Sequence, residues 1–352
     1  NPATFGYIHH FYLTLFFLMA LLPVSFYFLL KQIFPKSEWS RMEYSLWALI
    51  FSTIFFEVTP NLSESNYWLA GAATYFAPCV LFNFYLAIWL GKIQKRDWAI
   101  SFYELIFFIV ILFCIETSNE TFILVSVVFQ IFLLLFAYFH FGNRSLRFFW
   151  VLLFVAVVVG FFSFSSPGNR GRFAHYQQNQ VLSWMVWMKR IVQALEEGTL
   201  AAWSKIFERN LIFLTSLLAA IRLRGAMVFT HRISFKSLFL VSGGLITLVG
   251  VISFLPSYLA TGVAPLSRTQ TGMTFLVFLV ALLTIMIFFQ NERVLRFFMI
   301  SRNHRILLFV EIMISLLLIM NMLRAPNYRL AKRDLQSGMA QRYFREIGVW
   351  ID

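Results

Sequence analysis

A short polar turn with two arginines gives the clearest chemical signal in this sequence. Residues 166–172 read Ser-Pro-Gly-Asn-Arg-Gly-Arg and interrupt a chain that is otherwise mostly apolar. Pro followed by Gly favours a tight turn, and the guanidinium groups of Arg170 and Arg172 match phosphate oxygens two at a time. Asn169 can bond to a ligand hydroxyl, and His175 could donate to the same phosphate or carry a proton. The alternative is an ordinary turn whose arginines touch lipid headgroups.

Carboxylates and aromatic rings gather in a second segment, residues 57–68. Glu57 and Glu64 could each remove a proton from an acceptor hydroxyl or hold a divalent ion. Plain solvation is the alternative for both acids, and it is favoured for Glu64. Tyr67 and Trp68 are typical of interfacial anchors, and their rings could also stack on a sugar.

Isolated charges elsewhere carry weaker signals. Arg268 and Arg324 each lie close to a proline beyond the end of an apolar run, where they could complete a phosphate clamp. Glu104 and Glu311 lie inside apolar runs near their ends, which favours snorkelling or pairing with basic loop residues. The sequence contains neither a Gly-rich phosphate loop nor a zinc-type His/Glu pair, so neither an ATP site nor a zinc site is predicted, and a divalent cation at the acids of residues 57–68 is the one cofactor left open.

Apolar helices must position these residues. The chain has 352 residues, of which 60% are hydrophobic and only 13% charged, too few charges for a soluble domain of this size. Apolar runs of about 18 residues or more recur, the length that a bilayer demands of a helix. We predict an all-α polytopic bundle with ten spans, at residues 10–30, 43–58, 69–91, 99–116, 121–139, 147–163, 200–221, 237–256, 270–290 and 305–323.

The connections alternate in charge and thereby predict an orientation. Those around residues 31–41, 92–96, 144–147, 222–236 and 293–305 are basic, whereas the first opposite loops contain acids and neither Lys nor Arg. Excess positive charge marks the cytoplasmic side. Residues 1–323 are therefore predicted to form one membrane domain with outer-face loops at 57–68, 164–202 and 257–269, followed by a short extracytoplasmic tail at 324–352.

Two further expectations follow from the pattern. Because residue 1 falls outside in this orientation, we expect an upstream span and its outer loop to precede it; a processed terminus is the alternative. Residues 178–198 place apolar side chains at helical spacing, which predicts an amphipathic helix lying in the interface. The net charge of +13 is spread over many loops, so nucleic acid is not an expected partner.

One set of short motifs carries a family resemblance. Tyr67-Trp68-Leu69-Ala70-Gly71, Tyr75 and Pro78, followed by Ser166-Pro167-Gly168-Asn169 and Arg172, resembles a pattern of an uncharacterised bacterial membrane-protein family. That family is similar to the GT-C glycosyltransferases, which take a sugar from a polyprenyl phosphate or diphosphate on the outer face. The resemblance covers roughly residues 55–330 and is carried by short motifs. It adds Tyr75 to the candidate substrate contacts.

The resemblance implies a location and a mechanism. The protein would lie in the bacterial cytoplasmic membrane with its active site on the periplasmic side, and would transfer a lipid-linked sugar to a glycan, lipid or protein acceptor. It implies a base in the first outer loop, which this chain lacks; Glu57 would belong to the second outer loop. Arg170 and Arg172 would meet the carrier phosphate, and the 178–198 helix would cover the lipid entrance.

Two other functions stay open at this point. An O-antigen ligase or polymerase would make His175 more central than Glu57. A non-enzymatic transporter of lipid-linked sugars, or an assembly subunit with partner subunits, would place polar residues along a path through the middle of the membrane.

Overall fold

The protein is all-helical, as the sequence predicts. A computed structural model describes residues 11–35, 40–60, 62, 72–95, 100–141, 146–165, 183–222, 235–289 and 304–337, and within these residues every regular element is a helix. In chain order the helices are α2 (Phe11–Ile33), α3 (Arg41–Val58), η3 (Ala72–Phe76), α5 (Ala77–Lys95), α6 (Phe102–Glu116), α7 (Glu120–Phe141), α8 (Leu146–Phe164), α10 (Trp184–Phe207), η5 (Glu208–Asn210), α11 (Leu211–Arg222), α12 (Phe235–Thr261), η6 (Ser267–Gln270), α13 (Thr271–Phe289), α15 (His304–Leu323) and α16 (Pro326–Ser337).

Several of these helices have the length and composition of membrane spans. Five in the described part of the chain are long and apolar enough to cross a bilayer, namely Phe16–Ile33, Ala72–Ile93, Glu120–Phe139, Leu146–Phe164 and Lys236–Thr261. Shorter apolar helices occupy Leu211–Ile221, Thr271–Ile285 and Leu308–Leu323. Each of the ten spans expected from the sequence overlaps a helix, and the count of ten stays a prediction.

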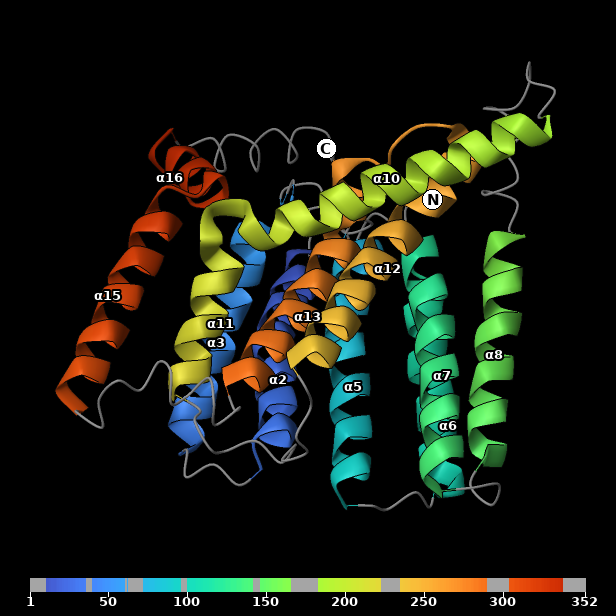
Figure 1. Ribbon diagram of the computed structural model, residues 1–352, viewed down its shortest axis with the longest axis horizontal. Helices are drawn as coiled ribbons and strands as arrows, with labels where there is room; N and C mark the ends of the chain where they lie inside the picture. Colours follow the sequence, from blue (N-terminus) through green and yellow to red (C-terminus); the bar gives the residue numbers. More distant parts are fainter. Residues whose placement is uncertain are drawn as a thin grey trace.

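Helix ends gather at two levels, called upper and lower here as they appear in Figure 1. At the lower level, Tyr44 OH at the start of α3 donates to Phe34 O after α2, at 2.6 Å. At the upper level, Asn119 Nδ2 between α6 and α7 donates to Thr74 O in η3, also at 2.6 Å. Segments that the sequence assigns to one side of the membrane thus meet at one level.

Local capping explains where two of the helices start. Ser40 and Ser101 each accept a hydrogen bond from the N–H three residues later, at 3.2 and 3.3 Å. The carboxylates of the glutamates at those positions in turn accept a hydrogen bond from the serine N–H at 2.8 Å. The two bonds together form a capping box. Glu104 also contacts Lys92 Nζ at 2.8 Å. Glu104 therefore forms an ion pair, as expected from the sequence, and its partner is Lys92.

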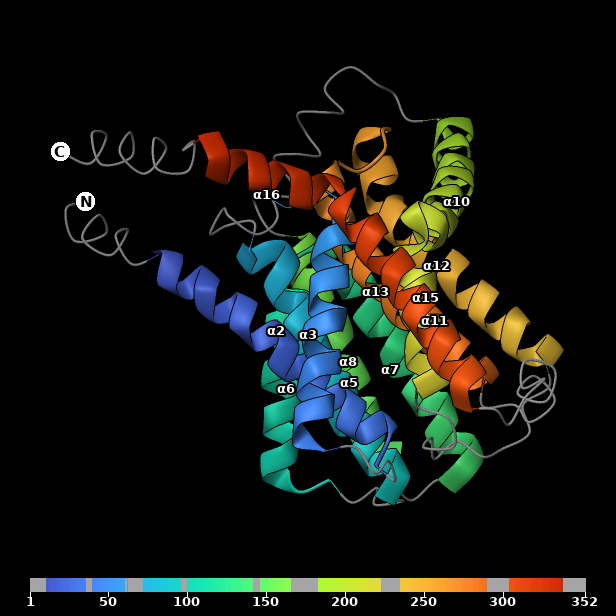
Figure 2. The ribbon, with the colours of Figure 1, turned by 90° about the vertical axis from the view of Figure 1, so that its left-hand side faces the viewer.

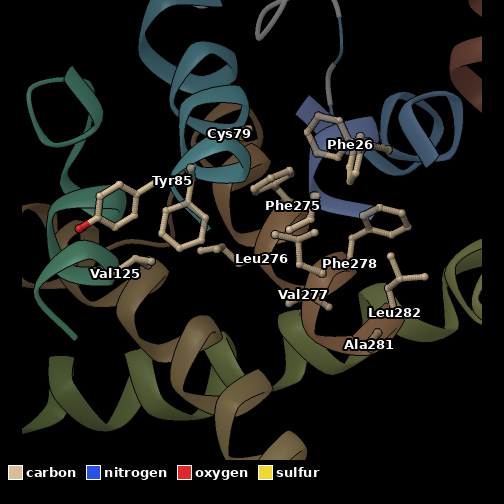
Figure 3. Packing of buried hydrophobic residues seen from close by; sticks show 14 of the residues in the cluster. Phe26, Cys79, Tyr85, Val125, Phe275, Leu276, Val277, Phe278, Ala281 and Leu282 are labelled. Atoms are coloured by element: carbon tan, nitrogen blue, oxygen red, sulfur yellow. The ribbon is translucent and has the colours of Figure 1, made fainter. Parts of the chain in front are cut away.

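Aromatic packing around α13 forms the centre of the bundle. Phe275 and Phe278 are fully buried and lie opposite Phe26 of α2, with ring centroids 6.3 and 5.9 Å apart (Figure 3). Helices at the edge instead expose large apolar side chains, such as Phe154 on α8 and Phe309 on α15. A water-soluble bundle would leave these rings hydrated, whereas a bilayer covers them at no such cost.

Helix α10 lies across the upper ends of the bundle and crosses α12 closely (Figure 1). A Cβ placed on Gly198 would lie 2.6 Å from Gly250 O, so the two backbones touch, as at small-residue contacts between membrane helices. Trp203 Nε1 adds a bond to Thr247 Oγ1 at 3.2 Å. Small residues recur at four-residue spacing on the buried stripe of α10: Ala194, Gly198 and Ala202.

The predicted start of the seventh span, at residue 200, is wrong. Residues 200–207, assigned from the sequence to a span, continue α10 instead, and the chain turns at η5 before α11 begins. Asn210 has a φ of 56° at this corner, and Lys205 Nζ donates to Glu208 Oε2 at 2.6 Å beside it. The apolar residues at 200–207 suggested the start of a membrane span, but Ala202 and Trp203 among them contact α12.

Candidate functional site

Glu57, the strongest acidic candidate from the sequence, lies at the upper level in the last turn of α3. It is half-buried, and its Oε2 accepts a hydrogen bond from the backbone N–H of Tyr328 at 3.3 Å. Tyr328 is in the first turn of α16, where N–H groups have no partner within the helix. A carboxylate also suits the positive end of the helix dipole. Glu57 therefore caps α16 from another helix.

Asn327 at the start of α16 in turn caps the C-terminal end of α3. Its Nδ2 donates to Phe56 O at 2.7 Å and to Thr59 O at 3.0 Å, with Glu57 O at 3.4 Å. These carbonyls belong to the C-terminal end of α3, which has no intrahelical donors left for them. The end of α3 and the start of α16 thus satisfy each other, and this brings Glu57 close to the segment that carries Arg324.

Several cations lie near this junction in the sequence. Arg324 lies in the turn between α15 and α16 and is exposed. Three more exposed cations follow on α16: Arg329, Lys332 and Arg333. Arginine forks and lysine ammonium groups are the usual protein partners of phosphate. The structure therefore places a carboxylate and one exposed arginine, Arg324, at one part of the upper level, and the three cations of α16 follow along that helix.

Tyr75 lies next along the same level. It is half-buried in η3, a π-helical turn of the kind often found at functional sites. The following residue, Phe76, stacks on Phe56 with ring centroids 5.6 Å apart and an interplanar angle of 26°. This aromatic contact joins the Tyr75 segment directly to the residue before Glu57.

Glu116 is a site candidate that the sequence reading missed. It ends α6 and is fully buried, and neither of its carboxylate oxygens has a hydrogen-bond partner within the residues that the structure describes. The turn that follows it is bonded through Asn119 to Thr74, beside Tyr75. From the sequence, Glu116 counts only as one of the acids in a short loop opposite the basic connections. It continues the buried stripe of Phe108 and Leu112 at four-residue spacing, and that periodicity was the available signal.

These contacts define what we call the upper rim: Glu57, Tyr75, Glu116 and Arg324 with the segments that hold them. Within the described residues, no three His, Cys, Asp or Glu side chains gather as a metal ion would require. A rim of this kind can remove a proton from a hydroxyl and bind an anion beside it.

Part of the positive charge at the upper level has a structural role. Arg190 of α10 is only 6% exposed. Its Nη1 donates to Leu259 O at 3.0 Å, at the C-terminal end of α12 where carbonyls lack partners. A Cβ on Gly262, which has a φ of +76°, would lie 3.0 Å from Nη2. Arg190 thus caps α12 and anchors α10.

The remaining sequence candidates lie outside the described residues. These are Glu64, Tyr67, Trp68, Asn169, Arg170, Arg172 and His175. Arg268 lies in η6 at the upper level, and its side chain is likewise not described. The phosphate-binding turn at 166–172 therefore stays a prediction.

Comparison with known proteins gives no relative: no protein-family model, no curated protein and no solved structure matches this chain. The class is consequently defined by the structure alone. Its apolar helices mark it as an all-helical membrane protein.

Proposed function

We propose that the protein is a membrane glycosyltransferase, which moves a sugar from a polyprenyl-phosphate-type carrier to an acceptor at its upper rim. The observation that carries the proposal is the junction of α3 and α16, where the Glu57 carboxylate is held close in the chain to the turn that carries the exposed Arg324. Transfer of a sugar from a lipid phosphate needs those two kinds of group within reach of one another.

The chemistry is a displacement at the anomeric carbon. A carboxylate takes the proton of the acceptor hydroxyl, the acceptor oxygen bonds to the anomeric carbon, and the bond from that carbon to the phosphate oxygen breaks. The electron pair leaves with the lipid phosphate, and cations stabilise the charge. Arg324 is the described rim residue suited to this last task, because it is exposed beside the capped end of α3. Such stabilisation is stronger near a dry interface than in bulk water.

Helix α10 supports the proposal from the side of the lipid. Its N-terminal half exposes apolar residues to the surroundings of the bundle, while Arg190 and the small-residue stripe fix it to α12. A helix held in this way at membrane depth presents an apolar surface along which a prenyl chain could lie. The exposed apolar residues on this half are Trp184, Met185, Met188, Val192 and Leu195.

Two hydrogen-bonded polar pairs inside the bundle are better explained by helix packing than by the transporter alternative. Asn83 Nδ2 donates to Ser25 Oγ at 3.0 Å, and Gln130 Nε2 donates to Tyr85 OH at 2.7 Å. Each pair joins two different helices, while the amide oxygens Asn83 Oδ1 and Gln130 Oε1 have no partner among the described residues. Paired polar side chains of this kind hold membrane helices together, whereas a transport path would keep its polar groups available to a passing ligand.

Turnover of defined donors tests the proposal. The full chain is reconstituted in phosphatidylcholine vesicles with polyprenyl phosphates that carry radiolabelled sugars, and release of polyprenyl phosphate is measured with membrane extract as acceptor. We expect Glu57→Gln to lower release by about 10²–10⁴-fold and Arg324→Ala to raise the donor concentration needed. Arg147→Ala is the matched control, an exposed arginine at the lower level, and should release as the wild type does.

Folding of each variant is checked by size-exclusion chromatography and thermal unfolding. The proposal is rejected when no polyprenyl donor is consumed by the folded wild type. A loss of assembly with a partner in the Glu57→Gln variant, at unchanged turnover, would point instead to a structural subunit.

A further inference from the structure

Helix α16 carries a surface that the transfer reaction does not use. Its first turn is fixed to α3 by Asn327 and Glu57, and from there the helix projects sideways from the bundle at the upper level (Figure 2). It follows α15 after a turn of two residues, Arg324 and Ala325. The start of α16 is therefore fixed, and the rest of the helix extends away from the protein.

The cations of α16 share one side of this helix. At about 100° per residue, Arg329, Lys332 and Arg333 fall within about 100° of one another, and Asn327 falls on the opposite side. All three cations are exposed. Because Asn327 marks the side that docks on α3, the cationic side faces away from the bundle.

Among the side chains that the structure describes, no acid pairs with these three cations; Asp334 lies on the same helix, about 100° or more around from Arg329 and Arg333, and its side chain is not described. The described ion pairs lie elsewhere, between Lys92 and Glu104 and between Lys205 and Glu208. Three like charges on one turn and a half of an exposed helix repel each other by small amounts. An anionic partner would remove that repulsion, and its chemistry is set by the depth at which the helix lies.

The position of α16, directly after an apolar helix, fits the level of lipid headgroups. Helix α15 exposes apolar side chains along its length, with Phe309 63% and Leu323 51% exposed, as suits a helix that faces acyl chains. The apolar run ends at Leu323, and α16 starts three residues later. Tyr328 and Leu330 are also exposed on α16, and a tyrosine at this level is typical of the membrane interface.

We propose that the cationic face of α16, formed by Arg329, Lys332 and Arg333, is a docking surface for the anionic phospholipid headgroups of the leaflet at the upper level. Phosphate oxygens of the headgroups accept hydrogen bonds from the two guanidinium groups and the ammonium group. The inference is independent of the glycosyl transfer proposed above. It assigns to these three residues a lipid contact, whereas Arg324 and Glu57 belong to the rim.

The expected strength follows from membrane electrostatics. A Lys or Arg near an anionic surface is worth about five-fold in affinity, so three are worth on the order of a hundredfold. The preference should shrink as salt is raised, because exposed charges are screened beyond about 10 Å at 0.1 M ionic strength.

The test measures lipid retention on the purified full chain. Protein in detergent is mixed with equal amounts of phosphatidylcholine and phosphatidylglycerol, and retained lipids are counted by native mass spectrometry. We expect the wild type to retain phosphatidylglycerol in preference to phosphatidylcholine. In the variant R329Q/K332Q/R333Q this preference should fall on the order of a hundredfold. The control K31Q/R41Q/R147Q removes three exposed cations at the lower level and should keep it.

Each other result decides against the inference. A triple α16 variant that retains phosphatidylglycerol as the wild type does, or a control that loses it equally, places the lipid contact elsewhere. Inorganic phosphate at matched concentration is added in a separate arm; if it displaces the lipid, the surface is a site for small anions. If the triple variant does not purify, the single variants R329Q, K332Q and R333Q are measured instead. Each is expected to lower the preference for phosphatidylglycerol about five-fold. Single variants that retain phosphatidylglycerol as the wild type does would also refute the inference.

Discussion

The contact between α10 and α12 allows a sharp prediction, because one added methyl group should break it. In Gly250→Ala the new Cβ would lie 2.7 Å from Gly198 C and 2.8 Å from Ala202 Cβ, distances that real Cβ atoms essentially never show. The first of these atoms is backbone and cannot rotate away. The substitution must push α10 off α12, or bend one of the two helices.

The magnitude follows from a comparison with a second glycine of the same helix. A Cβ on Gly244 would meet nothing within 4 Å, so Gly244→Ala gains about 0.5–1 kcal/mol from helix propensity and nothing opposes it. Gly250→Ala has the same gain, but overpacking costs about 1–3 kcal/mol. Because the propensity gain cancels between the two variants, their difference in the free energy of unfolding should be about 1–3 kcal/mol, with Gly250→Ala the less stable.

Thermal unfolding of both variants in the same detergent measures this difference. Intrinsic fluorescence is a suitable signal, since Trp203 lies in the contact and bonds to Thr247. We expect Gly244→Ala to unfold at or above the wild-type temperature and Gly250→Ala to unfold below it. Equal stability of the two alanine variants would show that the two backbones do not touch, and the position of α10 across the upper level would then be wrong.

Three further substitutions test other contacts by the same measurement. Asn327→Ala leaves the carbonyls at the end of α3 without a donor and should lower the free energy of unfolding by about 1–3 kcal/mol. Gln336 is exposed on the same helix, so Gln336→Ala should cause no measurable loss. An equal loss of stability in both variants would disprove the cap. Arg190→Met removes the charged cap of α12 and should lower the free energy of unfolding by about 1–2 kcal/mol. Lys189 is exposed beside it, so Lys189→Met should be neutral. An Arg190→Met protein as stable as the wild type would contradict the anchoring role of Arg190. Glu116→Leu replaces a buried carboxyl without a described partner and should stabilise by about 1–3 kcal/mol, so a destabilised variant would reveal a partner for this acid.

Much of the helical framework could be predicted from the sequence. The span predicted at 147–163 corresponds to α8 at Leu146–Phe164, and that at 99–116 to α6 at Phe102–Glu116, because the length of an apolar run is set by the bilayer itself. The corner after Phe207 was not predictable in this way. Residues that pack against another helix and residues that face lipid are equally apolar, so hydropathy does not distinguish a helix lying across the bundle from one that crosses the membrane.

The candidate site was predictable only in part. Glu57 was recognised because an acid at the end of an apolar run stands out, but its partners, Asn327 and Tyr328, lie far along the chain. Contacts at such separation leave no periodic signal in one sequence. Glu116 was overlooked for the opposite reason: an acid next to polar residues looks solvated, and only the helical register of Phe108 and Leu112 shows that it turns inward.

The mutual capping of α3 and α16 also bears on how the molecule is assembled. Asn327 comes 268 residues after Thr59, whose carbonyl it satisfies. During synthesis the last turn of α3 must wait, bonded to water or to transient neighbours, until residue 327 has left the ribosome. Completion of that corner is thus a late event, and a ribosome that stalls before residue 327 would release a protein whose inserted helices are present but whose outer edge is unfinished.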